Sequence, residues 1–195
     1  MLVYLIRHGK TRYNLEGRYQ GSSDLPLCEE GRRALGRADF TPRRVYCSPM
    51  KRAAETAKLL FPESERIFVP DLREMDFGAF EGKNFRELED DPAYRSWVEG
   101  NCASPCPGGE GLEGFSRRVC AAFEKLMERE REQLVIVAHG GTQMAILEAY
   151  GRPRRDYFSW QSPNGGGFLL RAEDWKRRRE LELLEEIKGY GTKLI

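Results

Sequence analysis

Histidine is scarce in this 195-residue sequence, which contains only two. His8 follows an apolar run at residues 2–6 and Arg7, and His139 directly follows a second run at residues 134–138. Runs of this length and composition are typical of central strands that are buried on both faces. Because glycine follows each histidine, we expect both imidazoles at the carboxyl ends of central strands, where open α/β sheets build their sites.

A single histidine at a strand end is more often a structural residue than a catalytic one. Here two histidines occur in matching contexts, and Arg7 precedes one of them. An arginine and a histidine that leave an apolar strand are costly unless an anion or hydrogen-bonding partner meets them. The pattern therefore favours a functional site.

The sequence also lacks an excess of either charge and any long apolar run. It contains 32 basic and 31 acidic residues, for a formal net charge of +1, which argues against nucleic acid or an anionic membrane as a partner. No apolar stretch approaches the roughly 20 residues that span a bilayer, and the N-terminal residues do not resemble a signal peptide. We therefore expect a cytoplasmic protein.

Cysteines are few and scattered. Cys102 and Cys106 are the closest pair, and neither a histidine nor a second cysteine pair accompanies them. Reduced thiols are the default for such a set, and the spacing does not favour a metal site. The five cysteines are Cys28, Cys47, Cys102, Cys106 and Cys120.

Strand-like and helix-like segments alternate along the chain. Strands are expected at residues 2–6, 44–47, 67–69, 134–138 and 166–171, and helices at 29–37, 50–60, 85–99 (interrupted at Pro92), 112–131 and 142–150. Residues 178–187 fit either a helix or an edge strand. The alternation predicts an α/β three-layer sandwich with a mostly parallel central sheet covered by helices on both faces. The length fits one domain, 1–195, with residues 83–112 as a lid-like insertion.

The groups expected at the strand ends suit phosphoryl transfer. Neutral imidazole, here His8, is a good nucleophile near pH 7, and the guanidinium of Arg7 matches phosphate oxygens. Arg52, in the first turn of a helix, and His139 would add further donors. With the backbone amides that follow His139, these groups would form a preorganised cationic pocket for a transferring phosphoryl group.

A leaving alkoxide also needs a proton donor. Glu74 and Asp76 lie two residues apart, so in an extended loop both could face the same side. The spacing alone fits a solvated or arginine-paired carboxylate better than an acid catalyst.

Four motifs in order resemble the histidine phosphatase superfamily of phosphoglycerate mutase-like enzymes. They are LIRHGKT at residues 5–11 with Asn14 three residues on, SPMKRA at 48–53, LREMDFGAFEG at 72–82 and VAHGG at 137–141. The resemblance implies that His8 becomes phosphorylated and that Glu74, rather than Asp76 or Glu81, protonates the leaving oxygen and then activates water. It implies a catalytic role for His139 and a phosphate site made by Arg7, Asn14, Arg52, His139 and Gly140. It implies no metal or organic cofactor.

The compact chain and its DFGAFEG segment resemble the phosphatase branch of this superfamily. Residues 108–119 and the overall size are similar to alpha-ribazole phosphatases, which implies a phosphomonoesterase acting on a small phosphorylated metabolite. Mutase-type phosphoryl transfer and a non-catalytic phospho-ligand binding protein remain alternatives. Lys10 stands where many members carry glutamate, and residues 29–44 form a shorter stretch than usual. The oligomeric state stays open.

Substrate specificity is expected outside the four motifs. Residues 12–25 follow the nucleophile, and residues 83–112 form the lid-like insertion. For any single aromatic residue, ordinary packing is the more frequent role. The aromatic candidates for stacking on a substrate ring are Tyr19, Phe80, Phe85, Trp97, Tyr157 and Trp160.

Overall fold

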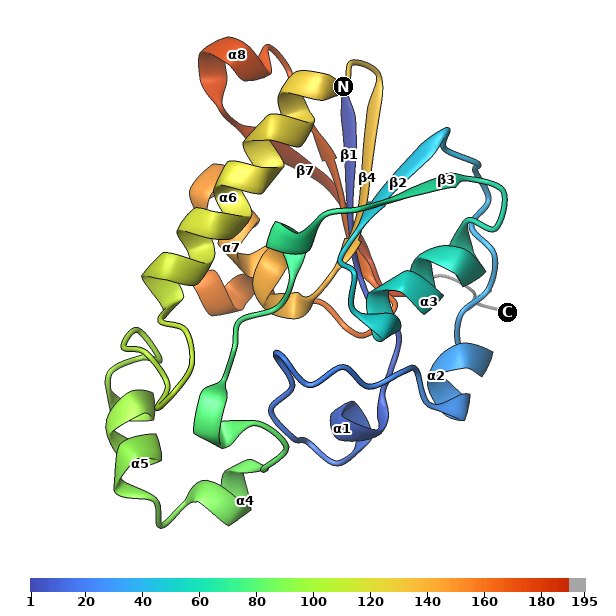
Figure 1. Cartoon of the computed structure of the whole chain (residues 1–195). Coiled ribbons are helices and arrows are strands. Elements are labelled where there is room, and N and C mark those ends of the chain that lie inside the picture. The colour runs from blue at the N-terminus through green and yellow to red at the C-terminus, as the bar shows by residue number, and fades with distance from the viewer. Residues whose placement is uncertain (190–195) are drawn as a thin grey trace.

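The structure is a computed structural model that describes residues 1–189 and forms a three-layer α/β sandwich (Figure 1). Within these residues seven strands form one sheet in the order β3-β2-β4-β1-β6-β7-β5. The first four strands in this order, β3, β2, β4 and β1, are parallel to one another, whereas β6 is antiparallel to both β1 and β7. The mostly parallel α/β sheet is therefore confirmed. The strands are β1 (Leu2–Arg7), β2 (Arg44–Cys47), β3 (Glu65–Phe68), β4 (Gln133–Ala138), β5 (Gly151–Arg152), β6 (Gly167–Arg171) and β7 (Leu181–Ile187).

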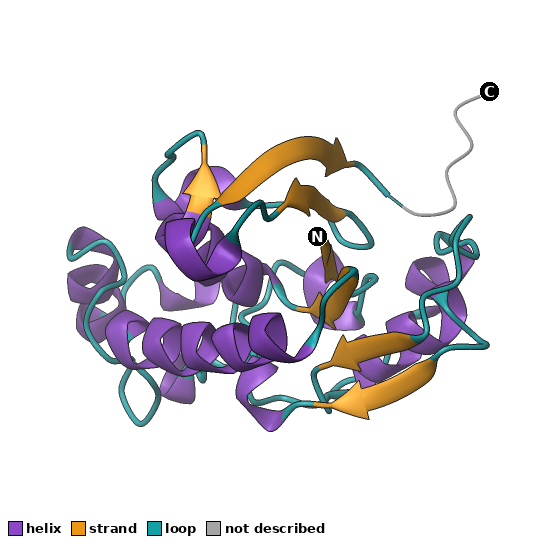
Figure 2. Ribbon diagram, turned by 90° about the horizontal axis from the view of Figure 1, so that it is seen from above, coloured by secondary structure: helices purple, strands orange, loops and turns teal. Residues whose placement is uncertain are grey.

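Helices cover both faces of this sheet. Figures 1 and 2 show α6 and α7 on one side and α3 on the other. The helices of the described chain are α1 (Arg12–Leu15), α2 (Glu29–Arg33), α3 (Lys51–Leu60), α4 (Phe85–Leu88), α5 (Pro92–Glu99), α6 (Leu112–Arg129), α7 (Gly140–Tyr150) and α8 (Trp175–Arg178). Short 3₁₀ turns occur at Pro70–Leu72, Gly78–Phe80 and Tyr157–Trp160.

The surroundings of β4 explain why the apolar run at residues 134–138 contains no polar residue. Alternate residues of a strand point to opposite faces, and both faces of β4 are covered. Leu134 and Ile136 belong to the core on the α6 and α7 side, whereas Val135 and Val137 pack into the core that contains Leu60 of α3. All four β4 side chains are buried.

Several element boundaries differ from the expectations. Helix α2 ends at Arg33 rather than at residue 37, because the chain turns away before Gly36 and the Ala38 amide bonds to the Leu60 carbonyl. Strand β3 starts two residues early because it pairs in parallel with β2. The ambiguous segment at 178–187 is mainly strand β7, which pairs with β6. The expected interruption near Pro92 is present, since α4 ends at Leu88 and α5 begins at Pro92.

Residues 83–112 lie with α1 beyond the carboxyl ends of β1 and β4 (Figure 1). They pack against the segment that follows the nucleophile motif, because the hydroxyls of Tyr19 and Tyr94 are 2.9 Å apart and the Tyr19 ring contacts Trp97. Residues 83–112 are thus attached to the body of the protein at the edge where a site is expected.

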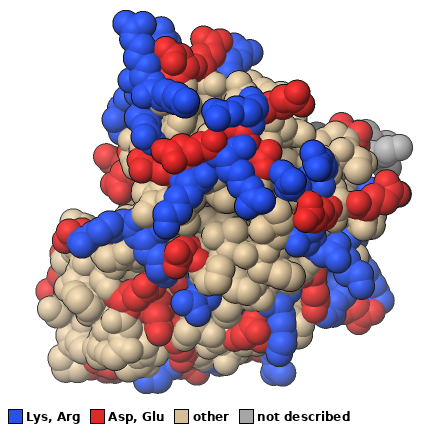
Figure 3. All heavy atoms as spheres, turned by 45° about the horizontal axis from the view of Figure 1, so that its top comes forward, with Lys and Arg blue, Asp and Glu red and all other residues tan. Residues whose placement is uncertain are grey.

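Acidic and basic side chains are interspersed over the upper and right parts of the face shown in Figure 3, whereas its lower left part is mostly uncharged. No helix within residues 1–189 has the length and apolar character needed to cross a membrane.

Candidate active site

The two histidines lie side by side at the carboxyl ends of neighbouring central strands. Strands β1 and β4 are paired in parallel with Arg7 opposite Ala138, so the next residue of each strand is a histidine. The His8 amide donates to the Ala138 carbonyl at 2.9 Å, and the two ring centroids are 5.2 Å apart. The predicted placement of both imidazoles is confirmed.

One contact fixes the tautomer of His8. Its Nδ1 lies 2.7 Å from the Gly9 carbonyl oxygen, which can only accept a hydrogen bond. In the neutral ring Nδ1 therefore carries the proton, and Nε2 keeps a free lone pair. The Gly9 amide in turn donates to Thr56 Oγ1 at 2.9 Å, which fixes the loop that follows the strand.

His139 has the opposite tautomer. Arg52 Nε donates to its Nδ1 at 3.3 Å, so the proton of the neutral ring lies on Nε2, which is 2.8 Å from Ser48 Oγ. Ser48 belongs to the motif at 48–53, but the sequence alone gave it no role. It now connects β2 to the histidine pair.

Both histidines are held neutral. Burial, followed by the charges of Arg52 and Arg7, lowers the pKa of His8 well below its usual value of 6.5. Burial and Arg52 also lower the pKa of His139 well below that value. A neutral His8 is the form that can act as a nucleophile at neutral pH.

Arg7 carries an unpaired buried donor. Its NH1 donates to the Ser162 carbonyl at 2.6 Å, whereas its Nε is buried and has no partner among residues 1–189. Gly140 allows the guanidinium to lie close to the start of α7, because a Cβ there would be 3.3 Å from Arg7 Cζ. A buried unpaired N–H is costly to the folded state.

Arg52 lies deeper than the phosphate-binding role implies. It is fully buried and donates to the carbonyls of Ser23 at 2.8 Å and Gly21 at 2.9 Å as well as to His139. Neither Arg52 nor His139 lines the cavity described below. In this arrangement Arg52 fixes the loop at 21–23 and adds positive charge behind His8.

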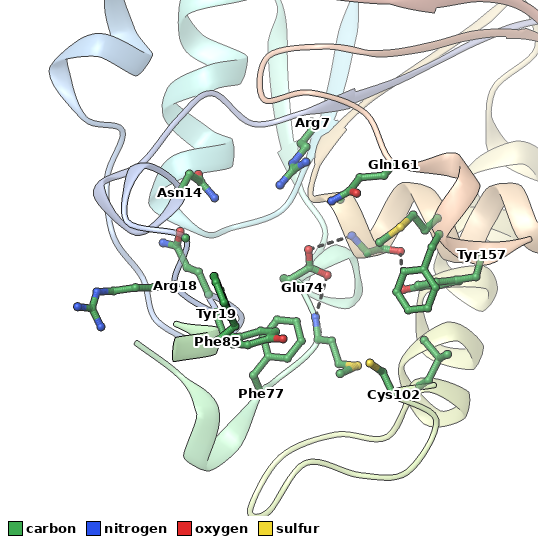
Figure 4. A pocket seen from close by; sticks show the side chains of 18 of the residues that line it. Arg7, Asn14, Arg18, Tyr19, Glu74, Phe77, Phe85, Cys102, Tyr157 and Gln161 are labelled. Atoms are coloured by element: carbon green, nitrogen blue, oxygen red, sulfur yellow. Dashed lines mark hydrogen bonds between the residues drawn. The ribbon is translucent and has the colours of Figure 1, made fainter. Parts of the chain in front are cut away.

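Asn14 lies within α1, completes the capping box of Thr11 and faces the cavity. Its Oδ1 accepts hydrogen bonds from the Thr11 amide at 3.0 Å and from Asn164 Nδ2 at 3.3 Å. Its Nδ2 is then the group that can donate to a ligand, and Figure 4 shows this nitrogen directed toward the space beside Arg7. Asn164 also donates to the His8 carbonyl at 3.2 Å. Sequence analysis assigned no role to Asn164, because its partners are remote in the chain.

Glu74 is the carboxylate that reaches this space. The Gly141 amide donates to its Oε2 and the Met75 amide to its Oε1, both at 3.0 Å. Burial raises the pKa of Glu74, although these two amides and the charges of Arg52 and Arg7 oppose the shift. The balance between desolvation and the arginines, which the sequence left open, is therefore a raised pKa for Glu74.

The neighbouring carboxylates are engaged elsewhere. Glu81 Oε1 accepts hydrogen bonds from the amides of Gly21 and Ser22, both at 2.8 Å. Asp76 Oδ1 accepts from the Gly78 amide at 2.9 Å and from Ser22 Oγ at 3.2 Å. Both side chains therefore hold loops, whereas Glu74 lines the cavity.

These groups form one end of a cavity of about 430 Å³. Figure 4 shows Arg7, Asn14, Gln161 and Glu74 at one end and a cluster of aromatic rings at the other. The lining residues include Arg7, His8, Asn14, Arg18, Tyr19, Glu74, Met75, Phe77, Phe85, Trp97, Cys102, Leu112, Gly140, Gly141, Met144, Tyr157, Phe158 and Gln161.

Four of the six aromatic candidates line this cavity, and two do not. Phe80 and Trp160 are fully buried and pack in the core, against Trp97 and Phe168 respectively. These two candidates have the ordinary packing role that was the more frequent expectation for any single ring, because tertiary packing buries them. Phe77 and Phe158 line the cavity without having been singled out. Within residues 1–189, no cluster of three or more histidine, cysteine or acidic side chains could hold a metal ion.

The comparisons with known proteins confirm the resemblance. Residues 3–182 match the family model described as histidine phosphatase superfamily (branch 1). The chain therefore belongs to the histidine phosphatase superfamily.

Individual relatives carry phosphatase names. An adenosylcobalamin/alpha-ribazole phosphatase from Salmonella typhimurium is 34% identical over 75% of this chain and 78% of that protein. A Hydrogenobacter thermophilus protein provisionally named phosphoserine phosphatase 2 is 35% identical over 74% of this chain and 76% of its own length. The crystal structure of an Escherichia coli protein, provisionally named alpha-ribazole-5'-P phosphatase, superposes with a TM-score of 0.81 at 26% identity and covers 99% of both chains.

Proposed function

We propose that this protein is a metal-independent phosphomonoesterase that works through a phosphohistidine at His8. The observation that carries the proposal is the pairing of a neutral His8, whose Nε2 lone pair is free, with the guanidinium of Arg7, which lines the same cavity. Arg7, Asn14 and the Gly140 amide would bind the phosphoryl oxygens from the cavity side. Arg52 and His139 would supply charge and hydrogen bonding from behind.

The first step forms the phosphoenzyme. His8 Nε2 attacks phosphorus, the bond to the ester oxygen breaks, and that oxygen takes the proton of the Glu74 carboxyl. The raised pKa of Glu74 supports this role because it increases the fraction of the carboxyl that carries a proton at a given pH. Its position between Arg7 and the aromatic end of the cavity suits a donor to the bridging oxygen (Figure 4).

The second step hydrolyses the phosphoenzyme. Glu74, now ionised, accepts a proton from water while the water oxygen attacks phosphorus. The bond between phosphorus and His8 Nε2 breaks, its electron pair returns to the ring, and inorganic phosphate leaves. Exposed rings at the cavity, such as Phe85, favour hydrolysis over mutase-type transfer, because a mutase must exclude water until a second hydroxyl arrives.

The substrate class proposed is a small phosphorylated metabolite in a cytoplasmic setting. Alpha-ribazole 5'-phosphate is the first compound to test, because the Salmonella relative carries that activity in its name. The segment at 83–112 would act as the lid over this substrate.

Trapping the phosphoenzyme tests the mechanism. A reaction with labelled substrate, quenched in alkali, should yield a phosphoprotein that is acid-labile and absent from His8→Ala. His139→Gln, which removes the neighbouring imidazole, should still give the label at His8 at a lower rate. Unchanged turnover by His8→Ala would refute the mechanism.

A further inference from the structure

The cavity has an aromatic and apolar end that phosphate chemistry does not use. The rings of Tyr19, Phe77 and Phe85 gather beyond Glu74, away from Arg7 (Figure 4). A phosphoryl group held at Arg7 and His8 places its alcohol toward these rings, because Glu74 must reach the bridging oxygen. Further apolar lining comes from Met75, Trp97, Leu112, Met144, Tyr157 and Phe158.

Two of these rings are left largely uncovered by the protein. Phe85 is 58% exposed and Phe158 is 55% exposed, yet both line the cavity. They come from separate segments, since Phe85 begins α4 and Phe158 lies in the 3₁₀ turn after Asp156. Phe158 packs edge-to-face against the buried ring of Tyr157, which fixes its orientation. Exposed aromatic surface at a cavity favours an apolar, planar ligand.

The charges around the cavity disfavour an anionic alcohol. Among the described lining residues the basic side chains are Arg7 and Arg18. Arg7 serves the phosphoryl end, and Arg18 is neutralised by Glu16 and Glu87, with N–O distances of 2.6 Å to each. A carboxylate on the alcohol would lose its hydration without gaining a free cation, and it would lie near Glu74.

We propose that this cavity selects phosphomonoesters of uncharged alcohols that carry a planar aromatic ring, with Phe85 and Phe158 contacting the ring, and discriminates against alcohols that carry a carboxylate. The inference rests on the proposed hydrolysis and adds its substrate class. A volume of about 430 Å³ lies in the range of sites that hold ring-containing ligands.

Four synthetic or simple esters test the selection. They are 2-phenylethyl phosphate, glycerol 1-phosphate, O-phosphoserine and 3-phosphoglycerate, which all share a primary alkyl leaving oxygen and differ in the ring or the carboxylate. We expect kcat/KM for 2-phenylethyl phosphate to exceed that for glycerol 1-phosphate by about tenfold or more. The two carboxylated esters should fall at least about tenfold below glycerol 1-phosphate.

Substitution of Phe85 and Phe158 tests whether these two rings cause the preference for the aromatic ester. Phe85→Ala and Phe158→Ala should each lower the ratio of kcat/KM for 2-phenylethyl phosphate to that for glycerol 1-phosphate by about tenfold. Phe68→Ala is the matched control, because Phe68 is 53% exposed on β3 and does not line the cavity. Its ratio should equal that of the unsubstituted protein. Thermal melts of the three variants separate a lost contact from a lost fold.

The outcomes distinguish the two proposals. A higher kcat/KM for O-phosphoserine or 3-phosphoglycerate than for 2-phenylethyl phosphate, with label still trapped at His8, would overturn the selection alone. If Arg18→Gln then removed that preference, Arg18 would be the carboxylate receptor. Unchanged ratios in both ring variants would also overturn the selection. Absence of hydrolysis and of label at His8 would instead overturn the proposed function.

Discussion

Gly140 and Gly141 are adjacent in the first turn of α7, but the structure predicts different outcomes when each becomes alanine. A Cβ on Gly141 would lie 2.2 Å from Glu74 Oε1 and 3.2 Å from Phe115 Cζ. A Cβ on Gly140 would have Arg7 Cζ as its nearest neighbour, at 3.3 Å. Carbon–oxygen contacts under 3.0 Å are not tolerated, so the Glu74 oxygen must move by about 0.8 Å (from 2.2 to 3.0 Å) or more.

This displacement falls on the proposed proton donor. A misplacement of about 1 Å in a catalytic group can lower a rate by about 100-fold. We therefore expect Gly141→Ala to lower kcat/KM for an alkyl phosphomonoester by about 100-fold. The neighbouring Gly140→Ala requires a shift of only a few tenths of an ångström, and its loss should stay below about tenfold.

The activity losses of Gly140→Ala and Gly141→Ala should not be accompanied by matching losses of folding stability. Alanine has a higher helix propensity than glycine, by up to about 1 kcal/mol, so neither substitution should unfold the protein through α7 itself. The assay combines kcat/KM with single-turnover labelling of His8 and a thermal melt for each variant. The reasoning fails if Gly141→Ala keeps alkyl-ester activity within about threefold of Gly140→Ala, or if its activity loss is matched by loss of the folded state.

Further predictions address the remaining groups of the site. Arg52→Ala should lower activity by at least about 100-fold, measured as kcat/KM, because it removes the charge behind His8 and releases the loop at 21–23. Glu74→Gln should slow the single-turnover phosphorylation of His8 strongly with alkyl esters and much less with aryl esters. If Asp76→Asn shows this leaving-group dependence and Glu74→Gln does not, Asp76 is the proton donor and the assignment to Glu74 is wrong. Activity should persist in chelator, because no cluster of three or more histidine, cysteine or acidic side chains within residues 1–189 could hold a metal ion; loss of activity restored by one divalent ion would contradict this. Burial lowers the pKa of both histidines in the folded protein. Below about pH 6.5 the unfolded chain therefore binds two protons that the folded chain does not bind. This difference persists until the pH reaches the lowered pKa values of the folded state. As the pH falls, the free energy of unfolding should therefore drop by about 2.7 kcal/mol per pH unit relative to that of the double variant His8→Gln/His139→Gln. Chemical denaturation of the two proteins that shows no such difference would refute the buried neutral state.

The strand ends were the most predictable part of the fold. Uninterrupted apolar runs identify β1 and β4, because a strand covered on both faces has no position for a polar side chain. Short elements such as α1 and β5 span too few residues to show a period, so they could not be predicted. The end of α2 depends on a backbone bond from Ala38 to Leu60. No local pattern indicates that contact.

The residues of the candidate site were proposed from the sequence, whereas their geometry was not. The resemblance indicated Glu74, and the structure shows that Asp76 and Glu81 hold loops instead. The depth of Arg52 depends on the carbonyls of Gly21 and Ser23, which lie about 30 positions away in sequence. Such contacts arise only once the loop and α3 are packed together.

The two histidines follow paired residues of one parallel ladder, and this has a consequence for how the protein can be altered. Their separation is set by the β1–β4 register and not by the loops or by residues 83–112. The histidine pair and the part of the cavity lining that residues 83–112 contribute are therefore independently replaceable. Exchange of the segment at 83–112 between relatives should transfer substrate preference while the imidazole pair keeps its geometry, which makes this fold a natural starting point for building chimeric enzymes.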